Sequence, residues 1–127
     1  ITPLEILRGK SDFMAVLESE EQVRTLQPDV IVLSTLPVRG VIVTAKGDSV
    51  DFVSRFFAPQ SGIAEDPVTG SAHTTLTPYW AEKLGKTELS ALQVSPRGGV
   101  LKTKLFGDRV EIAGQVKLYL TGTIEVE

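Results

Sequence analysis

Cysteine is absent from this 127-residue sequence, and histidine occurs once, as His73. Without thiols the chain can form no disulfide and no thiolate metal site. A single histidine beside scattered carboxylates makes no coordination set either. We therefore expect no metal ion, and the missing cysteines favour a cytoplasmic protein.

Long apolar runs and clustered positive charge are missing as well. No stretch approaches the roughly 18 apolar residues of a membrane span, and no signal peptide is recognisable, so we expect no membrane partner. The formal net charge is −3 and the lysines and arginines form no basic patch, so nucleic acid is not expected as a partner. What remains is an ordinary globular composition, with 42% apolar and 23% charged residues.

The length predicts a single domain, residues 1–127, that is large enough to bury a core. The first residue is Ile1 and not Met, and a strand-like run follows at once. From this we expect the chain to be an excised or processed piece of a longer protein.

Short apolar runs bounded by turn residues predict a protein made largely of strands. The predicted strands are residues 1–7, 13–17, 38–45, 50–57, 92–95, 100–106, 109–113 and 116–127. The last has the clearest alternation, with Val116, Leu118, Leu120, Ile124 and Val126 on one face. Gly47-Asp48 and Gly107-Asp108 indicate hairpin turns between successive strands.

Helical signals are fewer. A short helix is predicted after Ser19, whose acidic and amide neighbours suit a first turn. The segment Asp29–Leu36 is apolar enough to be either a buried helix or a strand, and periodicity does not separate the two. The one substantial helix follows Gly70 and ends near Leu84, before Gly85.

Pro78 lies inside that long helical stretch and predicts a kink, or two short helices with Thr77 capping the second. An apolar stripe at helical spacing predicts that the helix packs in the core. Strands before and after a single apolar helix predict an α+β fold. We expect a mostly antiparallel, β-barrel-like sheet wrapped around this central helix.

The chemistry is concentrated in one turn, Glu65-Asp66-Pro67-Val68-Thr69-Gly70-Ser71-Ala72-His73. Gly70 permits a tight turn, and Ser71 and Ala72 fall in the first helical turn, where backbone N–H groups lack partners. Such a helix start suits a carboxylate or phosphate. The alternative is a plain helix cap made by Thr69 or Ser71, with Asp66 placed favourably near the positive end of the helix.

Hydrolytic and metal chemistry are excluded by spacing. Ser71 and His73 are two residues apart on a helix and point nearly opposite ways, so they cannot act as nucleophile and base. The motif G-x-S-x-G is missing because Thr69 stands two positions before Ser71. Glu65 and Asp66 point to opposite sides of an extended segment and do not form a metal site. We interpret His73 as a packing or supporting group of the early helix.

A second small constellation is Arg97-Gly98-Gly99. An arginine followed by two flexible residues can close over a carboxylate, or it can simply form a turn before Val100. Arg55 is expected to reach the surface or to pair with Asp51 or Glu65.

Four blocks in this order and spacing resemble the phenazine-biosynthesis PhzF-like isomerase family, whose members share the diaminopimelate epimerase fold. The blocks are Ser54-Arg55-Phe56-Phe57-Ala58-Pro59, the turn Glu65–His73, Pro78-Tyr79-Trp80-Ala81 with Leu84-Gly85-Lys86, and Ser95-Pro96-Arg97-Gly98-Gly99. The family fold has two similar halves with the active site between them, and this chain resembles the C-terminal half.

The resemblance implies a cofactor-independent isomerase or epimerase that moves a proton on a small carboxylated substrate. It places Asp66 and Ser71 at catalytic positions, and Gly70, Ser71 and Ala72 where the substrate carboxylate meets the helix. Arg97 and Gly98 lie near the cleft by the same resemblance. The family's catalytic glutamate belongs to the other half and has no counterpart here, so this chain alone is not expected to be active.

Two kinds of partner follow from these expectations. The missing N-terminal half, or a second copy of this chain in a homodimer, would cover the face left bare. The rival interpretation is a non-catalytic domain that binds a small anion or dimerises.

Overall fold

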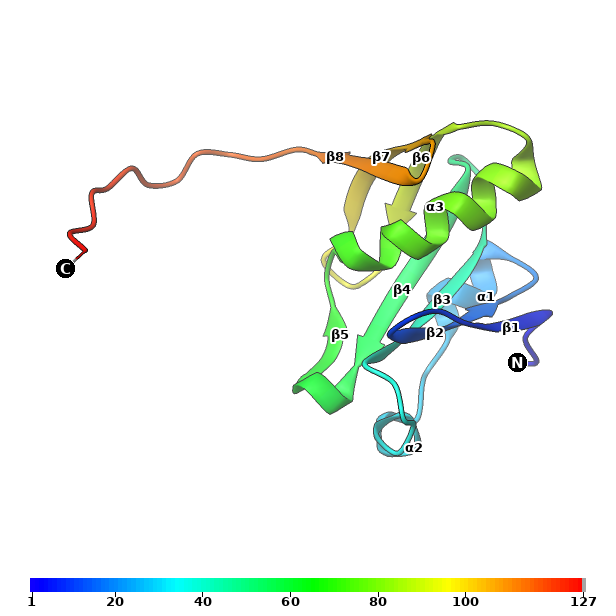
Figure 1. The fold of residues 1–127 in the computed structure, drawn as a ribbon. Helices are drawn as coiled ribbons and strands as arrows, with labels where there is room; N and C mark the ends of the chain where they lie inside the picture. Colours follow the sequence, from blue (N-terminus) through cyan, green and yellow to red (C-terminus); the bar gives the residue numbers. More distant parts are fainter. Residues whose placement is uncertain (127) are drawn as a thin grey trace.

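The computed structural model describes residues 1–126, in which one mixed β-sheet carries helices on both faces (Figure 1). The strands are β1 (Glu5–Arg8), β2 (Asp12–Val16), β3 (Gly40–Lys46), β4 (Phe52–Ala58), β5 (Ile63–Asp66), β6 (Glu88–Gln93), β7 (Gly99–Phe106) and β8 (Arg109–Gly114). The helices are α1 (Glu20–Thr25), α2 (Val30–Ser34) and α3 (Gly70–Leu84), with a short 3₁₀ turn at Pro59–Ser61. The α+β class expected from the sequence is therefore found.

The strands lie in the order β1-β2-β3-β4-β6-β7-β8, and β5 pairs with β4 off this path. The pairs β2–β3 and β4–β6 are parallel and the other pairs are antiparallel. Parallel neighbours need a long crossover, which α1 and α2 supply between β2 and β3, and α3 supplies between β4 and β6. The starting point of α3 is thus fixed by the strands on either side of it.

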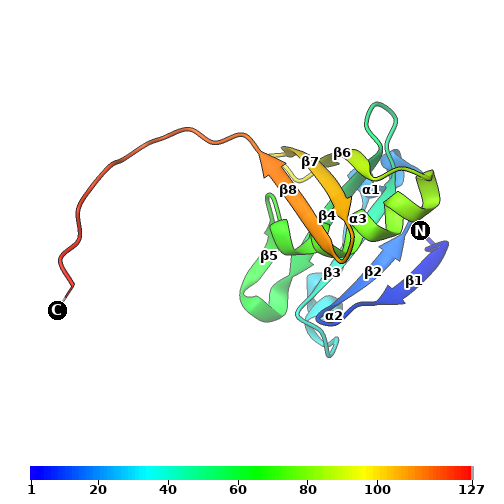
Figure 2. The same ribbon diagram turned by 45° about the horizontal axis from the view of Figure 1, so that its top comes forward.

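The sheet is open rather than closed, so the expected β-barrel-like wrapping is not confirmed. Strands from both ends of the sheet nevertheless contact α3. The hydroxyl of Tyr79 in α3 donates to Glu5 Oε1 of β1 at 3.1 Å, while α3 also contacts β6, β7 and β8. Strands β1 and β8 remain as the two ends of the ordered path (Figure 2).

Two apolar cores lie on opposite faces of the sheet. The first lies under α3, where Phe52 of β4 stacks on Trp80 with ring centroids 6.0 Å apart. The second lies under α1 and α2 and includes Val53, Phe57 and Val23. Because both faces of β4 are covered, every residue of this strand is buried.

Helix α3 runs unbroken through Pro78, so the alternative of two short helices is wrong. Pro78 is on the exposed face, where the carbonyl of Thr74 that loses its N–H partner can still be reached by water. The helix ends as predicted at Gly85, whose φ of 66° lies in the left-handed region that glycine tolerates.

The ambiguous segment after Pro28 forms the helix α2, capped by the Asp29 carboxylate, which accepts the N–H groups of Ile31 and Val32 at 3.0 Å each. The helix is not buried, however, and Ile31 is 80% exposed. The segment is therefore a helix, one of the two expected structures, but the expectation that such a helix is buried was wrong. Apolar composition does not itself supply a surface to pack against.

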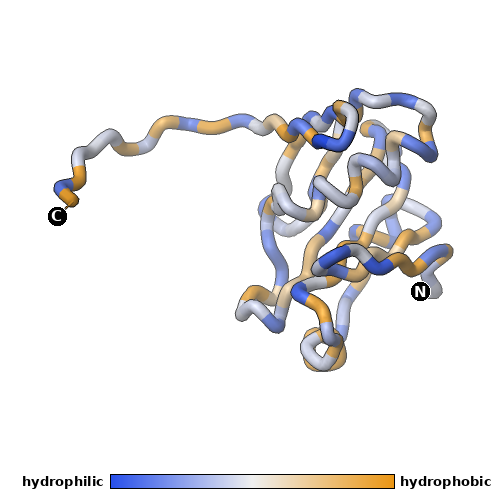
Figure 3. Tube along the Cα trace, viewed as in Figure 1, coloured by the Kyte–Doolittle hydropathy of each residue, from blue (hydrophilic) through white to orange (hydrophobic). Residues whose placement is uncertain are grey.

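The predicted strand 116–127 is also wrong over residues 116–126, and its last residue, Glu127, lies outside the described residues. Residues 115–126 form no strand, and their apolar side chains are 78–92% exposed at Val116, Leu118, Leu120, Ile124 and Val126. After Gly114 this C-terminal tail leaves the body of the molecule, with apolar and polar residues alternating along it (Figures 1 and 3). Alternation specifies which face is apolar, but a strand also needs a hydrogen-bonded neighbour.

The remaining strand, hairpin and short-helix predictions are confirmed, with ends shifted by a few residues. Ser19 caps α1 by accepting the N–H of Gln22, and Gly107 forms the β7–β8 turn with a positive φ of 59°. No helix within residues 1–126 has both the length and the apolar character to cross a membrane.

Candidate functional site

The predicted turn joins the end of β5 at Asp66 to the start of α3 at Gly70. Thr69 is the N-cap residue, with extended backbone angles of −117° and 102°, but its side chain makes no capping bond. Its hydroxyl instead donates to Asp66 Oδ2 at 2.5 Å. The first N–H groups of the helix are therefore left without the usual side-chain acceptor.

Those N–H groups belong to Gly70, Ser71 and Ala72, and within residues 1–126 no hydrogen bond to them is present. Gly70 and Ser71 are exposed, and a Cβ placed on Gly70 would meet no atom within 4 Å. The helix start therefore opens onto free space at Gly70 and Ser71, whereas Ala72 itself is buried. Three unpaired N–H groups at the positive end of a 15-residue helix can donate hydrogen bonds to a carboxylate or phosphate.

Gln93, the last residue of β6, holds this turn from the side, and its side chain is fully buried. Its Oε1 accepts the Thr69 N–H at 2.8 Å, and its Nε2 donates to the Asp66 carbonyl at 2.7 Å and to Thr69 Oγ1 at 3.0 Å. Ser95 adds a hydroxyl that donates to the Pro67 carbonyl at 2.7 Å. Sequence reasoning did not single out Gln93, and it named Ser95 only as part of the block Ser95–Gly99, without a contact to the turn.

Arg97 and Gly98 are brought beside the turn through these same contacts. The Gly98 N–H donates to Ser95 Oγ at 3.1 Å, and Gly98 has a positive φ of 73°. Arg97, Gly98 and Val68 line a hollow of about 370 Å³ that continues to the end of β8. Arg97 is exposed and makes no ion pair among the described residues.

His73 does not face this open side. Its ring is fully buried against Phe52, and Nδ1 lies 2.7 Å from the Thr69 carbonyl, to which it donates as N–H. Burial lowers the pKa of His73 below the ordinary value, and the hydrogen bond to the Thr69 carbonyl offsets this in part. A neutral, enclosed imidazole supports the turn from inside and cannot reach a substrate outside it.

Comparison with known proteins shows the family of the chain. A family model described as phenazine biosynthesis-like protein matches residues 2–122. The chain belongs to the phenazine biosynthesis-like family. A curated relative, an uncharacterised isomerase of Pseudomonas aeruginosa, is 52% identical over 126 residues, which are 99% of this chain and 48% of the relative. The human phenazine biosynthesis-like domain-containing protein is 49% identical over 72% of this chain and 34% of its own length.

Solved structures agree. A PhzF-family protein of Enterococcus faecalis has a TM-score of 0.88 at 51% identity, covering 93% of this chain and 45% of that protein. A PhzC/PhzF protein of Clostridium difficile has a TM-score of 0.88 at 41% identity, covering 99% of this chain and 49% of that protein. This phenazine biosynthesis-like chain spans about half the length of the relatives that it matches.

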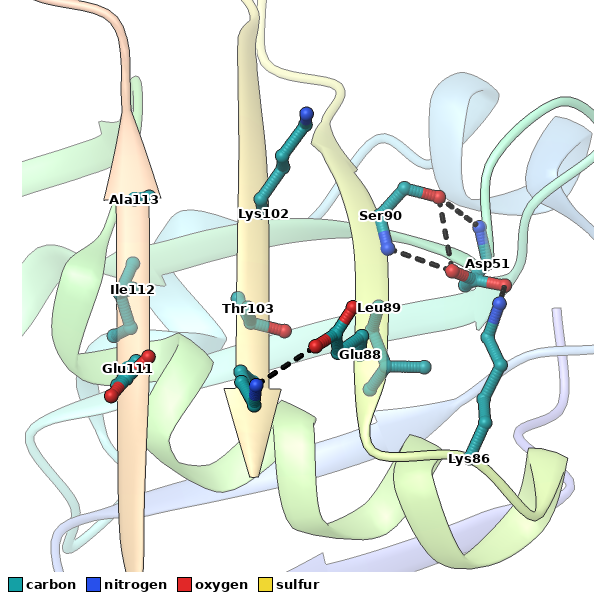
Figure 4. Close-up of a pocket in the computed structure, with 11 residues that line it drawn as sticks. Asp51, Lys86, Glu88, Leu89, Ser90, Lys102, Thr103, Glu111, Ile112 and Ala113 are labelled. Atoms are coloured by element: carbon teal, nitrogen blue, oxygen red, sulfur yellow. Dashed lines mark hydrogen bonds and ion pairs between the residues drawn. The ribbon is translucent and has the colours of Figure 1, made fainter. Parts of the chain in front are cut away.

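A separate hollow of the PhzF-like chain lies along β6, β7 and β8 and has a volume of about 610 Å³ (Figure 4). None of its lining residues belongs to the turn. Its charges are largely paired with one another, Lys86 with Asp51 at 2.6 Å and Lys104 with Glu88 at 2.8 Å. Such a set has little free charge left for a ligand.

Residues 1–126 contain no group of three or more His, Asp or Glu side chains that could hold a metal ion. The candidate site is thus made of backbone N–H groups, the Ser71 hydroxyl and the Asp66 carboxylate.

Proposed function

We propose that this chain forms one wall of the active site of a cofactor-independent isomerase or epimerase, which moves a proton on a small carboxylated metabolite. The observation that carries the proposal is the open helix start, where the unpaired N–H groups of Gly70, Ser71 and Ala72 lie next to Asp66. The isomerase names of relatives from Pseudomonas aeruginosa support the reaction class.

In this proposal the N–H groups of Gly70, Ser71 and Ala72, together with the Ser71 hydroxyl, bind the substrate carboxylate. Asp66 accepts or returns a proton near the reacting carbon. Arg97 and Gly98 line the adjacent hollow and contact a second polar group of the substrate.

A general base must lie within hydrogen-bond reach of the proton that it removes. Two other ionisable residues of the turn do not offer one. Glu65 accepts from Arg55 through both oxygens, at 2.7 and 2.8 Å, and His73 is fully buried. We therefore place the principal base outside this chain, on a partner that faces the turn.

The partner is either the half that the relatives possess beyond the matched region or a second copy of this chain. The C-terminal tail supports this part of the proposal, because its exposed alternating residues are those of a strand without a neighbour. In the relatives this chain accounts for 48% of the length, which leaves room for a domain of similar size.

The proposal is tested by joining this chain to the unmatched half of the Pseudomonas aeruginosa relative and following proton exchange in heavy water by NMR. Candidate substrates are small amino-acid and cyclohexadiene carboxylates. Asp66→Asn should lower the exchange rate by about 100-fold or more. Ser71→Ala removes a hydroxyl that binds the carboxylate, so it should lower the exchange rate at substrate concentrations below KM. The exposed Ser49, in the β3–β4 loop, supplies the matched control Ser49→Ala, which should exchange at the parent rate.

Loss of exchange in Ser49→Ala, or no exchange with any substrate, would contradict the isomerase proposal. In that case inorganic phosphate is added to the ¹⁵N-labelled chain. Shifts confined to the amides of Gly70, Ser71 and Ala72 would favour the rival, a non-catalytic anion-binding domain.

A further inference from the structure

Thr69 and Gln93 form a chain of hydrogen bonds that ends on the Asp66 carboxylate. Gln93 Nε2 donates to Thr69 Oγ1 at 3.0 Å, and Thr69 Oγ1 donates to Asp66 Oδ2 at 2.5 Å. Both residues are buried: Thr69 is 6% exposed and Gln93 is 0% exposed. Neither residue has a role in the function proposed so far.

The direction of this chain is fixed by its two ends. The Thr69 N–H needs an acceptor and the Asp66 carbonyl needs a donor, so Gln93 must present Oε1 to the first and Nε2 to the second. The second Nε2 hydrogen then points to Thr69 Oγ1. Because the Thr69 hydroxyl accepts this hydrogen bond, its own proton is free to be donated in a hydrogen bond to Asp66 Oδ2.

The result is that one oxygen of Asp66 is held and the other is not. Among residues 1–126 no hydrogen bond to Asp66 Oδ1 is present, whereas Oδ2 is bound by the Thr69 hydroxyl. A carboxylate fixed by one oxygen keeps a single orientation and still has a free oxygen for a substrate.

We propose that Thr69 and Gln93 are positioning residues, which orient Asp66 so that Oδ1 is the oxygen that meets the substrate. This inference rests on the proposed function for the identity of the substrate, but not for the orientation itself. Gln93 acts on the backbone of the turn, and Thr69 acts on the carboxylate.

The competing explanation is that these bonds only stabilise the fold. A purely stabilising bond could be removed without freeing the Asp66 side chain. The two explanations differ in the side-chain torsion of Asp66, which three-bond NMR couplings between its α and β protons measure directly.

The experiment compares Thr69→Val with the parent chain. Valine keeps the shape and removes the hydroxyl, so the Asp66 couplings should change from values of one staggered rotamer toward the average over rotamers. Thr69→Ser restores a hydroxyl and should restore the parent couplings. Thr74→Val is the matched control, because the Thr74 hydroxyl lies one turn along the same helix and donates to the Ser71 carbonyl.

Unchanged Asp66 couplings in Thr69→Val, or no rescue by Thr69→Ser, would overturn the proposal. If Thr69→Val does not fold, the parent chain still gives an answer. Both amide protons of Gln93 should exchange slowly and show contacts to Thr69 and Asp66, unlike the amide of the exposed Gln115. Rapid exchange of the Gln93 amide would contradict the chain of bonds.

In the joined two-half protein, Thr69→Val should lower kcat and leave KM nearly unchanged, because the N–H groups that bind the carboxylate are untouched. Ser71→Ala should instead raise KM. Failure to find any isomerase activity removes the proposed function but not the result on Asp66 orientation. Unchanged couplings remove the positioning role even if the enzyme is active.

Discussion

Gly99 lies so close to Val68, beside the candidate turn, that no side chain fits between them. A Cβ built on Gly99 would lie 2.2 Å from Val68 Cγ2, a distance that real side chains do not tolerate. Gly99→Ala should therefore push Val68 and the turn away from β7. We expect a loss of about 1–3 kcal/mol in the free energy of unfolding, measured by urea denaturation.

Two further variants decide whether this contact is the cause. Gly114→Ala is the control, because its Cβ would meet its nearest atom, the Val100 carbonyl oxygen, at 4.0 Å. The double variant Gly99→Ala with Val68→Ala should be less destabilised than the sum of its single changes. Strict additivity would mean that the cost of Gly99→Ala arises elsewhere.

The single buried histidine makes stability depend on pH. Burial lowers the pKa of His73 in the folded state, while the unfolded chain keeps about 6.5. Above 6.5 both states are neutral. As the pH falls below 6.5 the unfolded state binds the proton first, so the free energy of unfolding should decrease, by up to about 1.4 kcal/mol per pH unit, until the folded pKa is reached.

Urea denaturation at pH 7.5 and 5.5 checks this, with His73→Gln as the comparison. The variant should lose the pH dependence within this window, whatever its stability. The Asp48 N–H that Glu20 accepts lowers the pKa of this carboxyl in the folded state. The stability that Glu20 contributes is therefore lost only below about pH 4.5, outside the pH range of this measurement. Equal slopes in the two proteins would show that His73 is not responsible.

At this scale the sequence predicted the residues of the turn but not those that hold it. Gly70, Ser71 and Ala72 were identified because a helix start is a local feature. Gln93 is 24 residues from Thr69 in the chain, and its position in a strand gives no sign of the bonds that it makes.

The end of α1 and strand β5 are joined by one buried arginine. Arg55 binds both oxygens of Glu65, and its Nη1 donates to carbonyls of Val23 and Leu26 at 3.2 and 2.7 Å. Arg55→Met would leave the Glu65 carboxylate and these carbonyls without their partner. The free energy of unfolding should fall by about 3 kcal/mol or more.

Arg55→Lys keeps the charge but not the two-pronged geometry, so its stability should lie between those of the parent and Arg55→Met. Lys104→Met removes the exposed pair with Glu88 and should leave the urea midpoint unchanged within error. A similar loss in Lys104→Met and Arg55→Met would mean that a general loss of positive charge, and not the buried network, is being measured.

Among the elements, those with local signals were predicted and those that depend on a neighbour were not. The Gly107-Asp108 hairpin and the Gly85 helix end follow from backbone conformations that glycine permits. The exposure of α2 depends on what lies opposite it. The C-terminal tail has the pattern of a strand, but the pattern cannot supply the second strand.

The whole molecule divides into a body, residues 1–114, and the C-terminal tail. Since the described tail residues are almost fully exposed, deleting everything after Gly114 should leave the thermal midpoint of the body unchanged. In the joined two-half protein the same deletion should lower the midpoint, because there the tail would have a sheet to join.

Differential scanning calorimetry makes this comparison for the isolated chain and for the joined two-half protein, each with and without the tail. Light scattering reports the oligomeric state of each. A lower midpoint in the isolated chain, together with loss of a dimer, would instead identify a second copy as the tail's partner. Equal midpoints in the two-half protein would contradict docking of the tail there.

The hydrogen bonds from Gln93 and Ser95 to the turn also mean that the turn sequence cannot keep its geometry when it is separated from the rest of the chain. Gln93 and Ser95 reach it from beyond the end of α3, so residues 63–84 made as a synthetic peptide would carry the whole motif and none of its lateral bonds. Such a peptide would have no fixed Asp66 orientation. Grafting these residues onto another helix would transfer their sequence but not the hydrogen bonds that hold the turn. A designer who wants this site must transfer the β4–α3–β6 crossover with it.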